Sequence, residues 1–213
     1  MNLAKELDEL DRDGALRETA DAVARHDRAQ FLKVGALGAG AVLALPAIAS
    51  AQPSRTQDIA ILNYGLTLEY LEAAFYREAV ARGALSGRLL QFAQVAGAHE
   101  AAHVTLLRRV LGSRAVAEPT FDFKGTTGAP GTFQSTAIAL EDTGVAAYTG
   151  QAARVRQAPI LQAAAQIQAV EARHAAWIRR IAGQRPAPFA LDPSASMAQV
   201  LATLRRTGFV PGL

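Results

Sequence analysis

Two short stretches of the sequence pair a glutamate with a histidine three residues later, 100-EAAH-103 and 171-EARH-174. Residues i and i+3 of a helix lie on the same face, so one helix can direct a carboxylate and an imidazole toward one point. That spacing suits a metal ion. A single pair would be weak evidence, because it arises by chance in many helices rich in alanine and arginine.

The repetition of the pair makes the evidence stronger. Each pair is preceded by a glutamate that is followed by a tyrosine seven residues later, in 69-EYLEAAFY-76 and in 141-EDTGVAAY-148. The offsets between the copies are nearly constant: 141 − 69 = 72, 148 − 76 = 72, 171 − 100 = 71 and 174 − 103 = 71. This pattern predicts a duplicated helical hairpin whose halves pack about a pseudo-twofold axis.

Apolar residues at helical spacing predict the elements that carry these residues. The expected helices run from about Asp58 to the turn at Gly83, from 88 to 111, from 135 to about 155 with Ser135 as N-cap, and from Pro159 to Gly183. A fifth, short helix is expected over 196–206. The Gly, Thr and Pro residues of 112–134 predict a long crossover between the hairpins, since a phosphate-binding loop would need a Gly-Lys-Ser/Thr ending.

The four glutamates fall inside the apolar stripes of these helices. An unpaired buried carboxylate is costly, so each must be protonated, paired or bound to a cation. In a four-helix bundle, one Glu from each of two helices and a Glu-x-x-His from each of the other two converge on a dinuclear site. The expected ligands are Glu69, Glu100, His103, Glu141, Glu171 and His174.

Four carboxylates would balance the charge of two divalent ions. The donor set favours two iron or manganese ions and leaves zinc open. Glu72 lies at the edge of its stripe and His99 points away from Glu100, so neither is an expected ligand, and Glu72→Ala is expected to leave metal loading largely intact. The alternative interpretation keeps the Glu and His residues as hydrogen-bonded pairs without metal.

The composition excludes several kinds of site and one class of partner. The 213 residues include no Cys, which excludes disulfides, thiolate nucleophiles and Cys-based zinc sites. The net charge is +3, but the arginines are scattered and are not interleaved with aromatic residues. We therefore expect no nucleic-acid partner.

The first 51 residues have the features of an export signal. A long charged region ends in 28-RAQFLK-33, an apolar run covers 34–49, and Ala49-Ser50-Ala51 offers a cleavage site. The stretch 28–33 resembles the twin-arginine motif but has Ala29 where the second Arg should stand. The route is therefore open between twin-arginine export, general secretion and an uncleaved inner-membrane anchor, and an amphipathic helix followed by a buried hydrophobic hairpin is the non-export alternative.

Four runs resemble the ferritin-like superfamily: 61-ILNYGLTLEYLEAAFYREA-79, 99-HEAAH-103, 140-LEDTGVAAY-148 and 170-VEARHAAW-177. Within it, the chain is most similar to secreted bacterial ferritin-like proteins grouped with desiccation-related proteins. The resemblance implies an all-α, ferritin-like four-helix bundle and the same six metal ligands. It also implies that Tyr76 and Tyr148 lie near the metals, as candidate catalytic residues. The resulting organisation is an export signal over 1–51, the bundle over 52–184 and a tail with a short helix over 185–213.

Two functions remain open on these grounds. The first is oxidoreductase chemistry of dinuclear iron or manganese with dioxygen or peroxide, ferroxidase or catalase-like, in the periplasm or outside the cell. The second is a non-enzymatic, stress-protective or metal-sequestering bundle, as the desiccation-related resemblance implies. Besides metal ions and a small oxidant, the expected partners are the export machinery and a second copy of the chain in a homodimer.

Overall fold

The computed structural model describes residues 55–212, and the expected export signal lies outside them. The described chain is all helical. Its helices are α4 (Arg55–Arg82), α5 (Gly87–Leu111), the 3₁₀ turn η1 (Gly112–Arg114), α6 (Pro130–Ala152), α7 (Ala158–Ile181) and α8 (Met197–Thr207). No helix within residues 55–212 is both long and apolar enough to cross a membrane.

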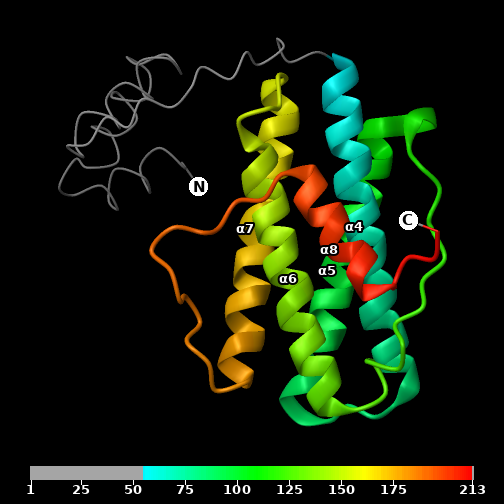
Figure 1. The fold of residues 1–213 in the computed structure, drawn as a ribbon, viewed down its shortest axis with the longest axis vertical. Helices are drawn as coiled ribbons and strands as arrows, with labels where there is room; N and C mark the ends of the chain where they lie inside the picture. The colour runs from blue at the N-terminus through cyan, green and yellow to red at the C-terminus, as the bar shows by residue number, and fades with distance from the viewer. Residues whose placement is uncertain (1–54, 213) are drawn as a thin grey trace, which may run out of the picture. The chain divides into compact units, whose positions relative to one another are not determined.

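The four long helices form a bundle of two hairpins (Figure 1). Helix α4 packs along α5 and α6 along α7, and the hairpins meet through α4 with α6 and α5 with α7. The segment between η1 and α6 runs the length of the bundle beside α4, so α6 starts at the end opposite to where α5 stops. The predicted ferritin-like bundle with a long crossover is therefore confirmed.

The crossover is held by its own aromatic residues. The Phe123 ring is buried, with its centroid 5.4 Å from the ring of Phe75 on α4 and 5.5 Å from that of Phe209. The Asp122 N–H also donates to the Phe209 carbonyl at 2.9 Å. A long connection without helix or strand is thus fixed to the bundle and to the chain after α8.

The start of α6 differs from the expected one. The helix begins at Pro130, which suits the first turn because its missing N–H would have no intrahelical partner there. Ser135, the expected N-cap, lies inside the helix, and its hydroxyl donates to the Gly131 carbonyl one turn earlier at 3.1 Å. Asp58 is not the first residue of α4, which begins at Arg55, but lies in its first turn. Its carboxylate accepts from the backbone N–H groups of Arg156 and Gln157 just before α7.

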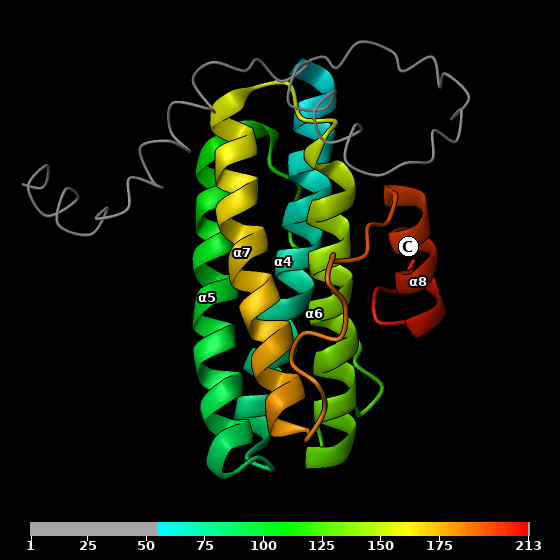
Figure 2. The ribbon, with the colours of Figure 1, turned by 90° about the vertical axis from the view of Figure 1, so that its left-hand side faces the viewer.

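The tail returns along the bundle and ends in α8, which packs on α6 (Figure 2). Ser196 caps α8 through a reciprocal capping box with Gln199. The Ala195 N–H donates to the Ala146 carbonyl at 2.9 Å. A Cβ atom on Gly150 would lie 2.0 Å from the Ala195 carbonyl oxygen, so the close contact of tail and α6 requires a glycine there.

Two apolar clusters fill the bundle. One contains the aromatic residues Phe75, Phe92 and Phe133, and the other contains Leu66, Leu107 and Ile167 together with their apolar neighbours. Along α4, Glu69 and Glu72 fall between Leu66 of the second cluster and Phe75 of the first. The glutamates therefore lie in a polar layer inside the bundle, with residues of both apolar clusters around it.

Candidate metal centre

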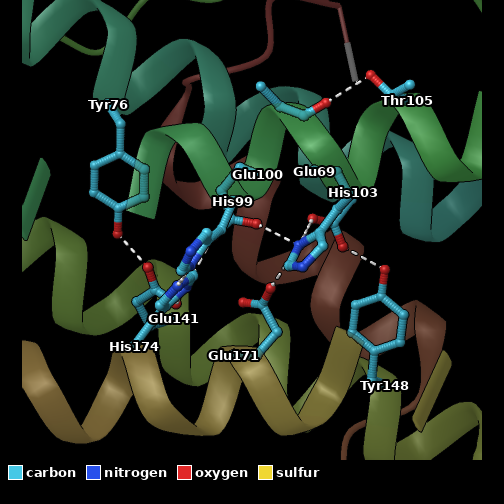
Figure 3. A network of polar contacts seen from close by, with 11 residues as sticks. Glu69, Tyr76, His99, Glu100, His103, Thr105, Glu141, Tyr148, Glu171 and His174 are labelled. Atoms are coloured by element: carbon cyan, nitrogen blue, oxygen red, sulfur yellow. Dashed lines mark hydrogen bonds and ion pairs between the residues drawn. The ribbon is translucent and has the colours of Figure 1, made fainter. Parts of the chain in front are cut away.

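Each of the four long helices brings carboxylate or imidazole groups to this polar layer (Figure 3). The six predicted ligands are all buried: Glu69, Glu100, Glu141 and Glu171 are 0 % exposed, His103 is 8 % exposed and His174 is 2 % exposed. Charged side chains are almost never fully buried unless paired or bound. Four fully buried carboxyls in one layer therefore require cations or protons.

The six residues form two groups that could each hold a metal ion. The first comprises Glu69, Glu100, His103 and Glu171, and the second comprises Glu100, Glu141, Glu171 and His174. Within each group, one donor atom from every residue lies within 4.8 Å of the others. Glu100 and Glu171 belong to both groups. The described chain thus carries two adjacent buried groups compatible with a dinuclear metal site.

The first half of the centre is built around His103. Its Nδ1 lies 2.8 Å from Glu100 Oε2, 3.0 Å from Glu69 Oε2 and 3.4 Å from Glu171 Oε1. One ring nitrogen carries one proton and can make one good hydrogen bond. Three carboxylate oxygens around that nitrogen are better explained by a shared cation than by mutual hydrogen bonds.

The second half is built around His174. Its Nδ1 lies 2.9 Å from Glu100 Oε1 and 3.4 Å from Glu141 Oε2. Neither contact has hydrogen-bond alignment. Within the described part of the chain, five buried donor or acceptor atoms of the centre have no hydrogen-bond partner: Glu100 Oε1, Glu141 Oε2, Glu171 Oε1, Glu171 Oε2 and His174 Nδ1. Buried polar groups are normally satisfied, so atoms left open in one place fit a metal centre.

The two tyrosines join the hairpins reciprocally. Tyr76 of α4 donates its hydroxyl to Glu141 of α6, and Tyr148 of α6 donates to Glu69 of α4. Each tyrosine therefore holds one oxygen of a carboxylate from the opposite hairpin. These crossed contacts are the pseudo-twofold relation that the repeat offsets predict.

The pKa values show how strongly the centre favours cations. Burial raises the pKa of Glu69 to about 7, helped by the Glu100 charge and opposed by His103. Burial and the charges of Glu100 and Glu69 hold the pKa of Glu171 well above its usual range. The surrounding carboxylates raise the pKa of His103 to about 12 and that of His174 to about 9, although burial acts against both imidazolium ions. Carboxylic acids retain protons here because the negative charge exceeds what the two imidazoliums can balance.

Glu72 and His99, which were not expected to be ligands, both lie next to the centre. Glu72 is 3 % exposed, so its expected place at the edge of the stripe is wrong. His99 is exposed, as expected, yet its Nδ1 lies 2.9 Å from His174 Nε2 and the two rings stack. The repeat offset pairs Glu72 with Gly144, but only the packing of α4 against α6 shows that the glycine leaves space for the Glu72 carboxyl.

A surface groove of about 400 Å³ between α5 and α7 leads to the two imidazoles. It is lined by His103 and His174 together with His99, Arg173 and Trp177. The histidine side of the centre therefore borders a surface groove. A small solute in this groove would meet both candidate ligands.

Comparison with known proteins agrees with the fold. The family model described as "Ferritin-like domain" matches residues 57–184, a range that includes all four long helices except the first two residues of α4. No curated protein matches the chain. Because that model covers more than half of the sequence and all six candidate ligands, the chain belongs to the ferritin-like domain family.

Proposed function

We propose that this chain holds two iron or manganese ions and uses them in oxidoreductase chemistry with dioxygen or peroxide. One observation carries the proposal: two buried groups of carboxylate and imidazole donors share Glu100 and Glu171. Four carboxylates balance two divalent ions in a layer where bare charges would be costly. Oxygen and imidazole donors without thiolate suit iron and manganese.

The arrangement assigns a part to each residue. Glu100 and Glu171 would bind both ions, Glu69 with His103 would complete one position, and Glu141 with His174 the other. Tyr76 and Tyr148 orient Glu141 and Glu69, since each hydroxyl occupies one carboxylate oxygen and leaves the second for the ion. The bound metals would supply the electron exchange with the oxidant, and the protein supplies placement and exclusion of water.

The groove between α5 and α7 is an argument that the oxidant is a small molecule. The groove is lined by the two imidazoles, and the glutamates of the centre are fully buried, so a large substrate in the groove would not reach the ions. Dioxygen and peroxide are small enough for such a passage. Reaction with a bulky organic substrate would require a wider opening.

The test is an activity assay on protein of known metal content. Full-length chain loaded with manganese is assayed for peroxide disproportionation, and chain loaded with iron for oxidation of further ferrous iron by dioxygen. We expect one of these activities in the wild type and its loss in Glu171→Gln, which keeps the side-chain shape but removes a shared ligand. Full metal loading with neither activity would favour the metal-sequestering or desiccation-protective function instead.

We also propose that the chain is exported, on the grounds of the sequence of residues 1–51. Expression of the full-length chain in a bacterium, followed by N-terminal sequencing of the periplasmic and secreted protein, tests this proposal. The expected mature N-terminus is Gln52. Full-length protein retained in the inner membrane would indicate the uncleaved anchor, and full-length protein in the cytoplasm would contradict export.

A further inference from the structure

The duplicated centre departs from its own symmetry at two pairs of positions, of which the first involves Glu72. The offset of 72 that relates Glu69 to Glu141 also relates Glu72 to position 144, and position 144 is a glycine (144 − 72 = 72). The first copy thus has a carboxylate where the second copy has no side chain. The six candidate ligands are matched in type between the two copies, so this difference affects a residue outside that set.

Gly144 provides the space that Glu72 occupies. A Cβ atom at position 144 would lie 3.3 Å from Glu72 Oε1 and 2.8 Å from Glu171 Oε2. The second distance is shorter than real Cβ contacts allow, so any side chain there would displace the shared ligand. The carboxyl groups of Glu72 and Glu171 therefore lie together over the backbone of α6.

The contacts along α4 place Glu72 in one half of the centre. Glu69 contacts His103, and Tyr76, two turns later, contacts Glu141. Glu72 lies between them on the same helix, on the way toward the Glu141–His174 half.

Glu72 has no protein cation to balance it. Among residues 56–212, the ion pairs of the centre join His103 and His174 to other glutamates, and none includes Glu72. Its side chain is nevertheless 97 % buried in the same layer (100 − 3). Glu72 is not a member of either four-residue donor group. It is a buried carboxyl beside a shared ligand and has no basic partner, so a metal ion held by Glu171 would supply the charge that balances it.

We propose that Glu72 is a further metal ligand, which binds the ion of the Glu141–His174 half and makes the two metal positions inequivalent. This inference rests on the proposed dinuclear function. His99 acts on the same half, because it contacts His174 whereas the matching position in the second copy is Val170 (170 − 99 = 71). Both departures from the repeat therefore strengthen one position over the other.

The test is a titration of chelator-treated full-length chain with Mn²⁺. Electron paramagnetic resonance measures binding as the loss of the signal of the free ion. The wild type should bind two ions per chain in two distinguishable steps. Glu72→Gln should weaken one step by about tenfold or more and leave the other nearly unchanged. Glu78→Gln is the control on the same helix, because Glu78 bonds Arg82 and Thr127 outside the centre.

Variants that lack one of the two histidine ligands show which half of the centre Glu72 affects. With His103→Ala, the remaining ion should depend on Glu72, so adding Glu72→Gln should weaken its binding. With His174→Ala, the same addition should have little effect. The opposite pattern, or two unchanged steps in Glu72→Gln, would overturn the inference while leaving the dinuclear site intact.

A second variant and a wild-type control keep the test of Glu72 decisive. If Glu72→Gln does not fold, Glu72→Asp serves in its place, because it keeps the charge and withdraws the carboxylate by one methylene, and the same single step should weaken. Absence of any binding of Mn²⁺ or Fe²⁺ to the folded wild type would overturn the proposed function and this inference together.

Discussion

At the scale of single residues, the centre depends on how each imidazole is oriented. A ligating histidine is usually fixed by a hydrogen bond from its second ring nitrogen. His174 directs Nδ1 toward the glutamates and Nε2 toward His99, whose Nδ1 lies 2.9 Å away. The proton on His174 Nε2 can then be donated to His99, which leaves Nδ1 free to bind a metal. His99 is thus a positioning residue for the Glu141–His174 half.

His99→Ala should lower Mn²⁺ affinity about 10- to 100-fold, mainly in one binding step, because His174 loses the partner that fixes its tautomer and ring plane. The titration described above measures this loss. Thr105→Val is the matched control on the same helix, since its hydroxyl donates only to the Ala101 carbonyl on the exposed face. Unchanged affinity in His99→Ala would show that the contact with His174 has no positioning role.

Residue types and spacing were sufficient to predict six of the residues in the polar layer. A carboxylate inside an apolar stripe conflicts with burial unless something binds it, and this conflict recurs at constant offset. The expected position of Glu72 at the edge of its stripe was wrong, because the helical stripe alone does not reveal the space left by a glycine on another helix. The relation between Glu72 and Gly144 depends on how α4 and α6 cross, which is a property of tertiary structure.

At the scale of elements, the helices themselves were more predictable than their starts. The apolar period requires a helix around Glu141 but does not say where the crossover ends. Pro130 and the back-bonded hydroxyl of Ser135 place the start of α6 earlier than the expected cap. By contrast, α8 begins where its capping residues predict, because Ser196 and Gln199 satisfy each other locally. Local capping chemistry is readable from sequence, whereas long-range docking of a connection is not.

The contact between the tail and α6 can be tested at Gly150. Gly→Ala inside a helix normally stabilises a protein by up to about 1 kcal/mol. At Gly150 we expect the opposite sign, a loss of about 1–3 kcal/mol, because the new Cβ would meet the Ala195 carbonyl and push the tail from α6. Urea unfolding monitored by circular dichroism measures the change.

Gly131→Ala is the control, since a Cβ atom there would have no neighbour within 4 Å. It lies in the same helix, in the first turn of α6. The control should be neutral or stabilising. Equal stabilisation of both variants would contradict the close packing of the tail against Gly150.

At the scale of the whole molecule, the centre reduces the stability of the bundle unless its charge is balanced. Five glutamates in the polar layer are matched by two histidines, so protons or metal cations must supply the rest. Bound cations that prefer the folded chain add to its stability by mass action. The fold and the metal loading are therefore linked through one electrostatic balance.

This linkage predicts how the stability of chelator-treated protein depends on pH. The pKa of Glu69 rises from 4.5 to about 7 on folding and that of His174 from 6.5 to about 9. Between the unfolded and the folded pKa of each group, the folded chain binds more protons than the unfolded chain. The free energy of unfolding should therefore fall as pH rises from about 5 to about 9. At lower pH, Glu100 has the opposite effect on the free energy of unfolding. Folding lowers its pKa to about 2, so its contribution to stability is lost as the pH falls toward that value.

Urea unfolding at several pH values, with chelator and with saturating Mn²⁺, measures the linkage. In the presence of Mn²⁺ the fall should be much smaller, because the ions replace the protons as balancing charge. A free energy of unfolding that stays level or rises over this range in chelator would show that the glutamates do not gain protons on folding.

Six side chains from four helices meet in one buried layer, and a pair of metal ions would explain why they do. Elemental analysis of natively expressed and purified full-length chain is the decisive test of these ions. We expect two iron or manganese atoms per chain in the wild type and loss of both in Glu100→Ala and Glu171→Ala. A folded, stable wild type that contains no metal and takes up none would contradict this explanation.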